Sequence, residues 1–535
     1  MKILRAKILA VSAMIMLAQA TMHAQIKEII AYYPEWGGRD HRYCVKDVEK
    51  TGAADKITAL AYAFCLPGQD SSGNIVPMFM NPVAAYQQVY SADLSIDGVA
   101  DDSTQALRGQ FNQLKKLKAR HPQLKVFISI GGWGGSKYFS DAALTPESRE
   151  KFTEAVIDRY IRGNLPVEDR AGGIGAAAGI FDGIDIDWEY PLSGGDEGVH
   201  HNENDKDNLT ELFRLFRKKL DAIDPKLILT AAVPVSDKLA RNYNMNKDQQ
   251  YLSWYHLMTY DFCGSWDKRS GHHTNLFSTA WQTQDEGMRE SLDYAVRYFR
   301  DTLGVRSDKL VPGAAFYGKG WITQDSVNGG LYRQGIAAAG IYEAGNNYFA
   351  DLACFTSKGY NYHWDNVAMA PSLFAPQDKI FWTMDDEKSV ALKSRYAEAY
   401  GLRGIMFWEI SGDDSNGSLV SAIYRGNMQD TDISKVKRGE ILKSISITAP
   451  TESQGLIEGS SLVIRTDAAD MAEIPGKVEF FVDGKSIGYD TRAPFSWVWF
   501  NIPAGKHEMK AVATLGAGSK VTSRTVILDV QQSGK

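Results

Sequence analysis

The sequence is poor in cysteine and has no excess of basic residues. Four cysteines occur among 535 residues, too few and too scattered for a disulfide scaffold or a C-x-x-C metal site. Lysine and arginine total 59 against 65 aspartates and glutamates, a net charge of -6. Because a protein that binds phosphate backbones needs a basic surface, this balance argues against a nucleic-acid partner.

Long hydrophobic runs are also missing. The longest, Ile8–Leu17, follows a basic start and precedes small residues, a pattern typical of a signal peptide over residues 1–24. It is far shorter than the roughly 20 residues that a membrane span needs, and no comparable stretch occurs later. We therefore expect an exported protein, extracellular or periplasmic, without a membrane span.

The chain has the composition of a folded protein, with 44% hydrophobic and 23% charged residues. At about 150 residues per unit, its length predicts more than one domain. After the signal peptide, short apolar runs recur at intervals long enough to hold a helix. The eight runs are Ile29–Tyr33, Ile57–Phe64, Lys125–Ile130, Gly183–Trp188, Leu227–Val233, Tyr255–Tyr260, Lys309–Phe316 and Gly404–Trp408.

Amphipathic stretches between these runs, such as Leu107–Arg120 and Asn208–Ile223, are spaced as helices. Eight apolar strands alternating with helices predict an α/β fold, a closed (β/α)8 TIM barrel over residues 25–425. An open doubly wound sheet is the alternative, but no strand is followed by a G-x-G-x-x-G turn. Short aromatic segments over residues 321–379 predict a small α+β insertion at the strand ends.

The pattern changes after the barrel. Residues 426–440 form a charged stretch that we interpret as a linker. Beyond it, residues 441–535 show alternating strands with turn residues every eight to twelve positions, which predicts an all-β immunoglobulin-like sandwich.

The fourth run carries a dense set of acids, Asp182, Asp185, Asp187 and Glu189. Because side chains alternate in a strand, the last three share one face, about 6 to 7 Å from one to the next. A solvated acidic face is the simple interpretation, but both faces of a barrel strand are covered, so these acids are expected to point inward. Burial and like charge predict protons shared along Asp185 and Asp187 and a raised pKa at Glu189, as a general acid requires.

These residues carry a resemblance to a known family. The spacing D-x-x-D-x-D-x-E resembles the signature of glycoside hydrolase family 18, the retaining chitinases. Ser129, Gly131 and Gly132 match its S-x-G-G motif, residues 258–262 match M-T-Y-D-F, and Trp408 ends the last strand as in that family. The resemblance covers about residues 26–425.

The resemblance implies a mechanism without an enzyme nucleophile, in which the substrate's own 2-acetamido oxygen attacks. It implies that Glu189 is the general acid and base, that Asp187 orients the acetamido N–H, and that Asp185 shares a proton with Asp187. Tyr260 is expected to donate its hydroxyl to the acetamido carbonyl. No cofactor is expected.

Substrate-binding residues are expected by the same resemblance, although an aromatic or Met at a strand end is often only core. The candidates are Tyr32, Phe64, Trp133, Met258, Asp261, Trp266, Tyr317 and Trp408. Where the family commonly has Arg after the seventh strand, this chain has Lys319, which keeps the charge but loses a bidentate fork. The pairs His200–His201 and His272–His273 have no third ligand at metal spacing, so no metal is predicted.

The sequence therefore predicts a secreted chitinase that binds chitin or N-acetylglucosamine oligosaccharides, and we expect a monomer. An endo-β-N-acetylglucosaminidase that cuts the chitobiose core of N-glycans is one alternative, because it uses the same chemistry. A non-catalytic chitin-binding lectin on the same barrel is the other. Such lectins usually lose the acid, whereas Glu189, Asp187 and Tyr260 are all present.

Overall fold

The computed structural model describes residues 28–40, 43–279, 290–427, 445–450, 456–467, 475–491, 495–514 and 520–532. The predicted signal peptide lies outside the described residues, as does nearly all of the predicted linker. Within the described part of the chain, no helix combines the length and the apolar character that a bilayer span requires.

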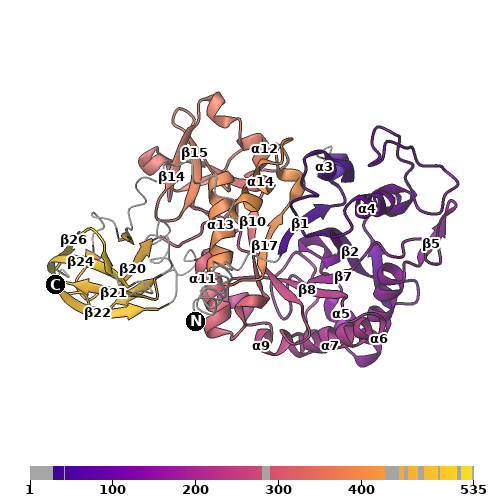
Figure 1. Cartoon of the computed structure of the whole chain (residues 1–535), viewed down its shortest axis with the longest axis horizontal. Helices are drawn as coiled ribbons and strands as arrows, with labels where there is room; N and C mark the ends of the chain where they lie inside the picture. Colours follow the sequence, from indigo (N-terminus) through magenta and orange to yellow (C-terminus); the bar gives the residue numbers. More distant parts are fainter. Residues whose placement is uncertain are drawn as a thin grey trace, which may run out of the picture.

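A closed barrel of parallel strands forms the larger part of the molecule (Figure 1). β1 pairs with β17 on one side and with β2 on the other, which closes the ring. In ring order the strands are β1 (Glu28–Pro34), β2 (Ala59–Gln69), β4 (Lys125–Gly131), β7 (Gly183–Asp187), β8 (Ile228–Val233), β9 (Trp254–Leu257), β10 (Leu310–Ala315) and β17 (Gly404–Trp408). The TIM barrel predicted from the eight apolar runs is confirmed.

Helices cover the outside of the barrel (Figure 1). In α7 (Asp205–Ile223), the buried residues Leu209, Leu212, Phe213, Phe216 and Leu220 recur at three- and four-residue spacing and pack toward the strands. Other helices are α3 (Val45–Lys50), α4 (Gly109–Arg120), α5 (Phe139–Ala143), α6 (Pro146–Val156), α9 (Met245–Asp248), α11 (Leu292–Arg297), α13 (Glu387–Ala399) and α14 (Ser418–Asn427). The apolar core has two parts. One lies between the strands and the outer helices, and the other fills the inside of the barrel and includes Ile30, Phe127, Trp254 and Met406.

An antiparallel sheet is inserted between β10 and α13. Its order is β12-β11-β16-β15-β14, and β13 pairs with the first residues of β11 along the same edge as β12. The strands are β11 (Tyr317–Thr323), β12 (Gly335–Ala337), β13 (Asn346–Tyr348), β14 (Asn361–Asp365), β15 (Ala370–Ala375) and β16 (Ile380–Met384), with the short helix α12 (Phe349–Leu352). A strand that the sequence did not predict, β3 (Ile75–Phe79), pairs antiparallel with the end of β2.

The C-terminal part is a two-sheet β-structure. One sheet contains β18 (Ser446–Ala449), β20 (Leu462–Asp467) and β23 (Ser496–Trp499). The other contains β19 (Leu456–Ile457), β26 (Val526–Gln531), β24 (Gly505–Thr514), β21 (Lys477–Val482) and β22 (Lys485–Asp490), with β25 (Lys520–Thr522) on β24. Alternate residues of β24 are buried between the sheets, as the sandwich prediction requires.

The sandwich contacts the barrel beside α11 (Figure 1). Arg297 of α11 donates to Ser496 Oγ at 2.7 Å. Arg465 of β20 donates to the Ser278 carbonyl oxygen at 2.6 Å and lies over the ring of Phe277. Two arginines therefore bridge the two domains.

Candidate active site

The acidic row lies inside the barrel. Asp185 and Asp187 are in β7, and the three carboxyl residues Asp185, Asp187 and Glu189 are only 0%, 4% and 7% exposed. β7 is shorter than the sequence pattern predicts, because it ends at Asp187. Beyond that point the Ser136 hydroxyl donates to the Asp187 carbonyl oxygen and accepts the Glu189 backbone N–H. Glu189 is thus held just past the strand end by a side chain instead of a sheet ladder.

Asp185, at the inner end of the row, is surrounded by hydrogen-bond donors. Its carboxylate accepts from the hydroxyls of Tyr32 at 2.8 Å, Ser129 at 2.8 Å and Thr230 at 2.6 Å. His256 Nδ1 lies 3.3 Å from Asp185 Oδ1. Burial alone would raise the pKa of Asp185, but the interaction with His256 and the donated hydrogen bonds bring this pKa below its usual value. These donors stabilise the charged form of Asp185, and the expected sharing of a proton between Asp185 and Asp187 stays a prediction.

The pKa values of Asp187 and Glu189 are shifted upward, in contrast to that of Asp185. Burial, together with the nearby Glu189 and Asp185, holds the pKa of Asp187 well above its usual value. Burial raises the pKa of Glu189 to about 7, assisted by the charge of Asp261 and opposed by a hydrogen bond with Tyr190. Asp187 Oδ1 is buried without a hydrogen-bond partner among the described residues. Burial thus favours the protonated forms of Asp187 and Glu189, and Asp187 Oδ1 lacks a donor among the described residues.

A raised pKa alone does not identify the reactive acid. Burial also raises the pKa of Glu409 and of Asp248 to about 7. Glu409 accepts from Tyr348 and Ser411, and Asp248 of α9 accepts from Thr210 on the outer helix α7. Of these three acids with a pKa of about 7, Glu189 is the one that belongs to the acidic row.

The hydroxyl of Tyr260 is available to a ligand. Tyr260 follows β9, is partly exposed, and its oxygen lies 3.9 Å from Met406 Sδ, a weak acceptor. Burial and the nearby Asp187 and Glu189 hold the pKa of Tyr260 well above its usual value. It therefore stays protonated and can donate. Met258, two residues earlier, is also partly exposed and packs with the cluster inside the barrel.

Aromatic rings gather at the end of β17. Trp408 stacks on Phe64 with ring centroids 5.5 Å apart and lies 5.6 Å from Tyr32. Trp36, just after β1, contacts both Trp408 and Phe64. Trp36 is not among the binding residues predicted from the sequence, although its position after a barrel strand was a usable signal. These rings offer the flat apolar surface that a sugar face can stack on.

Lys319 takes part in a cluster at the boundary of barrel and insertion. Its ammonium lies 3.4 Å from Asp261 Oδ1, and 5.3 and 5.1 Å from the ring centroids of Trp266 and Tyr317. Asp261 is in a left-handed conformation, with φ of 57°. Burial opposes the charge of Asp261, but Lys319 and His273 lower the pKa of Asp261 to about 2. A single ammonium therefore replaces the fork that an arginine would offer.

Two tryptophans near the site have largely solvent-exposed side chains. Trp133 is 56% exposed and Trp266 is 61% exposed. Trp133 meets the ring of Tyr190 edge-on at 6.5 Å. Since Tyr190 follows Glu189 directly, Trp133 lies on the acid's side of the site, where a sugar chain could stack on it.

Other residues singled out in the sequence lie elsewhere. Asp182 precedes β7, accepts the backbone N–H of Val126 and pairs with Lys118 at 2.7 Å, so it fixes the start of the strand and not the site. The residues of known position include no group of three or more His, Cys, Asp or Glu side chains placed to hold a metal ion.

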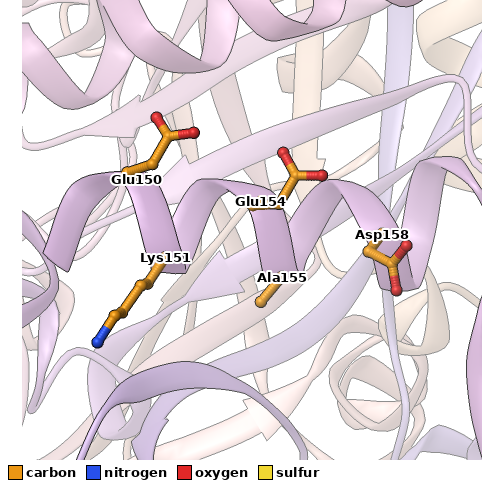
Figure 2. Close-up of a pocket in the computed structure, with 5 residues that line it drawn as sticks. All are labelled: Glu150, Lys151, Glu154, Ala155 and Asp158. Atoms are coloured by element: carbon orange, nitrogen blue, oxygen red, sulfur yellow. The ribbon is translucent and has the colours of Figure 1, made fainter. Parts of the chain in front are cut away.

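A hollow on the barrel surface lies along α6 (Figure 2). It is lined by Glu150, Lys151, Glu154, Ala155 and Asp158. Its acids are already paired: Lys219 contacts Glu150 and Glu154. The hollow is therefore a charged outer surface that has no part in the acidic row.

Comparison with known proteins agrees with this geometry. The family model described as glycosyl hydrolases family 18 matches residues 28–413. The chain belongs to glycosyl hydrolase family 18. A second model, a bacterial Ig domain, matches residues 444–511, in agreement with the predicted immunoglobulin-like sandwich.

Several relatives carry the name chitinase. Chitinase A1 of Niallia circulans is 34% identical over 72% of this chain and 56% of its own length, and chitinase C of Streptomyces lividans is 33% identical over 74% and 58%. The chain thus spans less than two thirds of these relatives. The catalytic domain of a psychrophilic chitinase B from Arthrobacter TAD20 superposes with a TM-score of 0.69 at 33% identity, covering 75% of this chain and 95% of that domain.

Proposed function

We propose that this protein is an exported, monomeric chitinase that hydrolyses β-1,4-N-acetylglucosaminide bonds with retention of configuration. The observation that carries the proposal is the state of the acidic row. Asp187 Oδ1 has no partner among the described residues, and beside it stands Glu189 with a pKa of about 7. An acetamido N–H is the donor that Asp187 lacks, and a glycosidic oxygen is a fitting acceptor for the proton of Glu189.

The proposed reaction gives each of these residues a role. Glu189 gives its proton to the glycosidic oxygen while the acetamido carbonyl oxygen attacks the anomeric carbon, so the C1–O bond breaks and an oxazolinium ion forms. Asp187 accepts the acetamido N–H, and Tyr260 donates to the acetamido oxygen. Glu189, now a carboxylate, takes a proton from water, which attacks the same carbon. Two inversions give net retention, and holding the attacking oxygen in place can lower the barrier by roughly 7 to 11 kcal/mol.

Two further facts support chitin over the alternatives. The matched relatives are named chitinases, and the acid that lectins on this barrel usually lose is present as Glu189. An endo-β-N-acetylglucosaminidase would use the same row on N-glycans, so the substrate must be tested directly. Export is supported only by the pattern of residues 1–24, and fractionation of the native cells and medium tests it.

The experiment is a product time course on N-acetyl-chitohexaose with analysis of the anomers, beside a high-mannose glycoprotein. We expect oligomers of retained configuration from the hexamer. Products from the glycoprotein alone would replace the chitinase proposal by the endoglycosidase, and inverted products would refute the mechanism.

A pair of variants tests the role of Glu189. Glu189→Gln keeps the shape but removes the proton, and we expect kcat to fall by about 10² to 10⁴ or more with oligomer binding retained. The control is Asp248→Asn, which changes another buried acid whose pKa is about 7 but which lies away from the row. Comparable turnover in Glu189→Gln would falsify the assignment of the acid.

A further inference from the structure

Two residues of β9 that are not part of the catalytic motif, Trp254 and His256, lie next to the inner end of the acidic row. His256 is the one that contacts Asp185. Both β9 residues are buried, at 2% and 0% exposure, and they lie two residues apart, so they share the inward face of the strand. Trp254 Nε1 donates to His256 Nε2 at 2.8 Å. His256 Nδ1 lies 2.7 Å from the Tyr32 hydroxyl oxygen.

These contacts fix the tautomer of His256. An indole N–H can only donate, so His256 Nε2 must carry a lone pair. The proton of a neutral imidazole is then on Nδ1, where it donates to the Tyr32 oxygen. A doubly protonated ring would set Nε2–H against the Trp254 N–H, two donors facing each other. The hydrogen bonds of Trp254 therefore favour the neutral Nδ1–H form.

With this tautomer, each hydrogen bond from Trp254 to Asp185 has a defined donor and acceptor. The Tyr32 oxygen accepts from His256, and the Tyr32 hydroxyl donates to Asp185 Oδ2 at 2.8 Å. If His256 carried its proton on Nε2 instead, Nδ1 would accept the Tyr32 proton and Asp185 would lose this donor. The tautomer of His256 thus decides whether the Tyr32 hydroxyl donates its hydrogen bond to Asp185.

Asp185, whose Oδ1 lies 3.3 Å from His256 Nδ1, favours a proton on Nδ1, while the Trp254 N–H opposes a proton on Nε2. The titratable groups that face it are Tyr32 of β1 and Asp185 of β7, while β4 contributes the ring of Phe127, stacked at 6.4 Å. The Arg403 guanidinium lies over the Trp254 ring, 5.0 Å from its centroid. Its charge is paired with Glu28 at 2.8 Å.

We propose that Trp254 and His256 are positioning residues for the hydrolysis, which hold the Tyr32 hydroxyl as a donor to Asp185. The kinetic part of this inference rests on the proposed function. The tautomer part does not, because it concerns the ligand-free protein alone.

The first test is the tautomer, observed directly. In protein labelled with ¹⁵N-histidine, a long-range ¹H–¹⁵N NMR spectrum separates Nδ1–H, Nε2–H and doubly protonated rings, and the His256→Phe spectrum identifies the signal by its loss. We expect a neutral Nδ1–H ring at pH 7. An Nε2–H or doubly protonated ring overturns the inference whatever the enzyme's substrate is.

The second test is kinetic. Trp254→Phe keeps an aromatic ring but removes the N–H, so Nε2 becomes free to bind a proton. A charge on His256 beside Asp185 would weaken proton binding at Asp187 and Glu189. We expect kcat on N-acetyl-chitohexaose to fall about tenfold or more, the range of one hydrogen bond to a charged group, with KM little changed. The fall should deepen as the pH is lowered.

The matched control is Trp382→Phe, the same change at an equally buried tryptophan of β16 in the insertion. Its pH profile should follow that of the unmodified enzyme. A folded Trp254→Phe protein with an unchanged pH profile and kcat would overturn the inference. If the unmodified enzyme has no activity on the hexamer, the proposed function fails, while the NMR result still stands or falls by itself.

Discussion

The effect of Tyr190 on the pKa of Glu189 makes a quantitative prediction. Burial raises the pKa of Glu189 to about 7, and the bond with Tyr190 acts against that rise because it stabilises the carboxylate. Tyr190→Phe removes the hydroxyl and keeps the ring that Trp133 contacts. A hydrogen bond to a charged group contributes about 1.5 to 3 kcal/mol, and 1.36 kcal/mol corresponds to one pH unit. The pKa of Glu189 should therefore rise by roughly one to two pH units.

The assay is kcat/KM against pH on a soluble N-acetyl-chito-oligosaccharide. This ratio reports the free enzyme, the state in which the contacts are described. In the proposed reaction Glu189 donates its proton first and must be protonated, so kcat/KM of the unmodified enzyme should fall as the pH rises through about 7. In Tyr190→Phe the midpoint of this fall should lie about one to two pH units higher.

Tyr243→Phe is the matched control. The Tyr243 hydroxyl is buried near Glu189 but donates to the Trp188 carbonyl oxygen at 2.8 Å. Its removal should cost about 1 kcal/mol of stability and leave the midpoint in place. A Tyr190→Phe midpoint that stays fixed or moves to lower pH would refute the account of how the pKa of Glu189 is set.

Three further predictions concern the scaffold. The Lys393 ammonium lies 2.5 Å from Asp385, so Lys393→Met leaves Asp385 as a buried charge without its cation. The free energy of unfolding should fall by about 3 to 5 kcal/mol. A loss below about 1 kcal/mol in a denaturant titration would contradict this. Gly131→Ala puts a methyl group against the Asp187 carbonyl at a φ of 110°, so kcat should drop about a hundredfold, and unchanged kinetics would count against it. Arg465→Ala removes a bridge between the domains, so small-angle scattering should show a longer maximum dimension; an unchanged curve would mean that other contacts hold the sandwich.

Much of the barrel could be predicted because its strands are buried on both faces. Each of the eight apolar runs overlaps one barrel strand, since continuous apolar runs of this length are what covered parallel strands require. The strand β3 escaped prediction because its sequence, Ile75–Phe79, is short and contains a proline. The exact boundaries of the signal peptide, linker and insertion stay predictions.

The candidate site was partly predictable. The spacing of Asp185, Asp187 and Glu189 placed them on one face, and their burial follows from the barrel. The different proton affinities within the row could not be read from that spacing, because they depend on donors from other strands. Trp254 and His256 could have been noticed, since with Met258 and Tyr260 they repeat every second residue.

The hydrogen-bond donors are distributed unequally along the acidic row, and acid catalysis by the row would depend on this difference. Three like carboxyls with like surroundings would share protons without direction. Here Asp185 receives hydroxyls from β1, β4 and β8, whereas Asp187 Oδ1 receives none from the described residues. Charge is therefore stabilised at the inner end of the row, at Asp185, and protonation is favoured at its outer end, at Asp187 and Glu189. The motif supplies the acids, but strands outside the motif decide which of them is protonated.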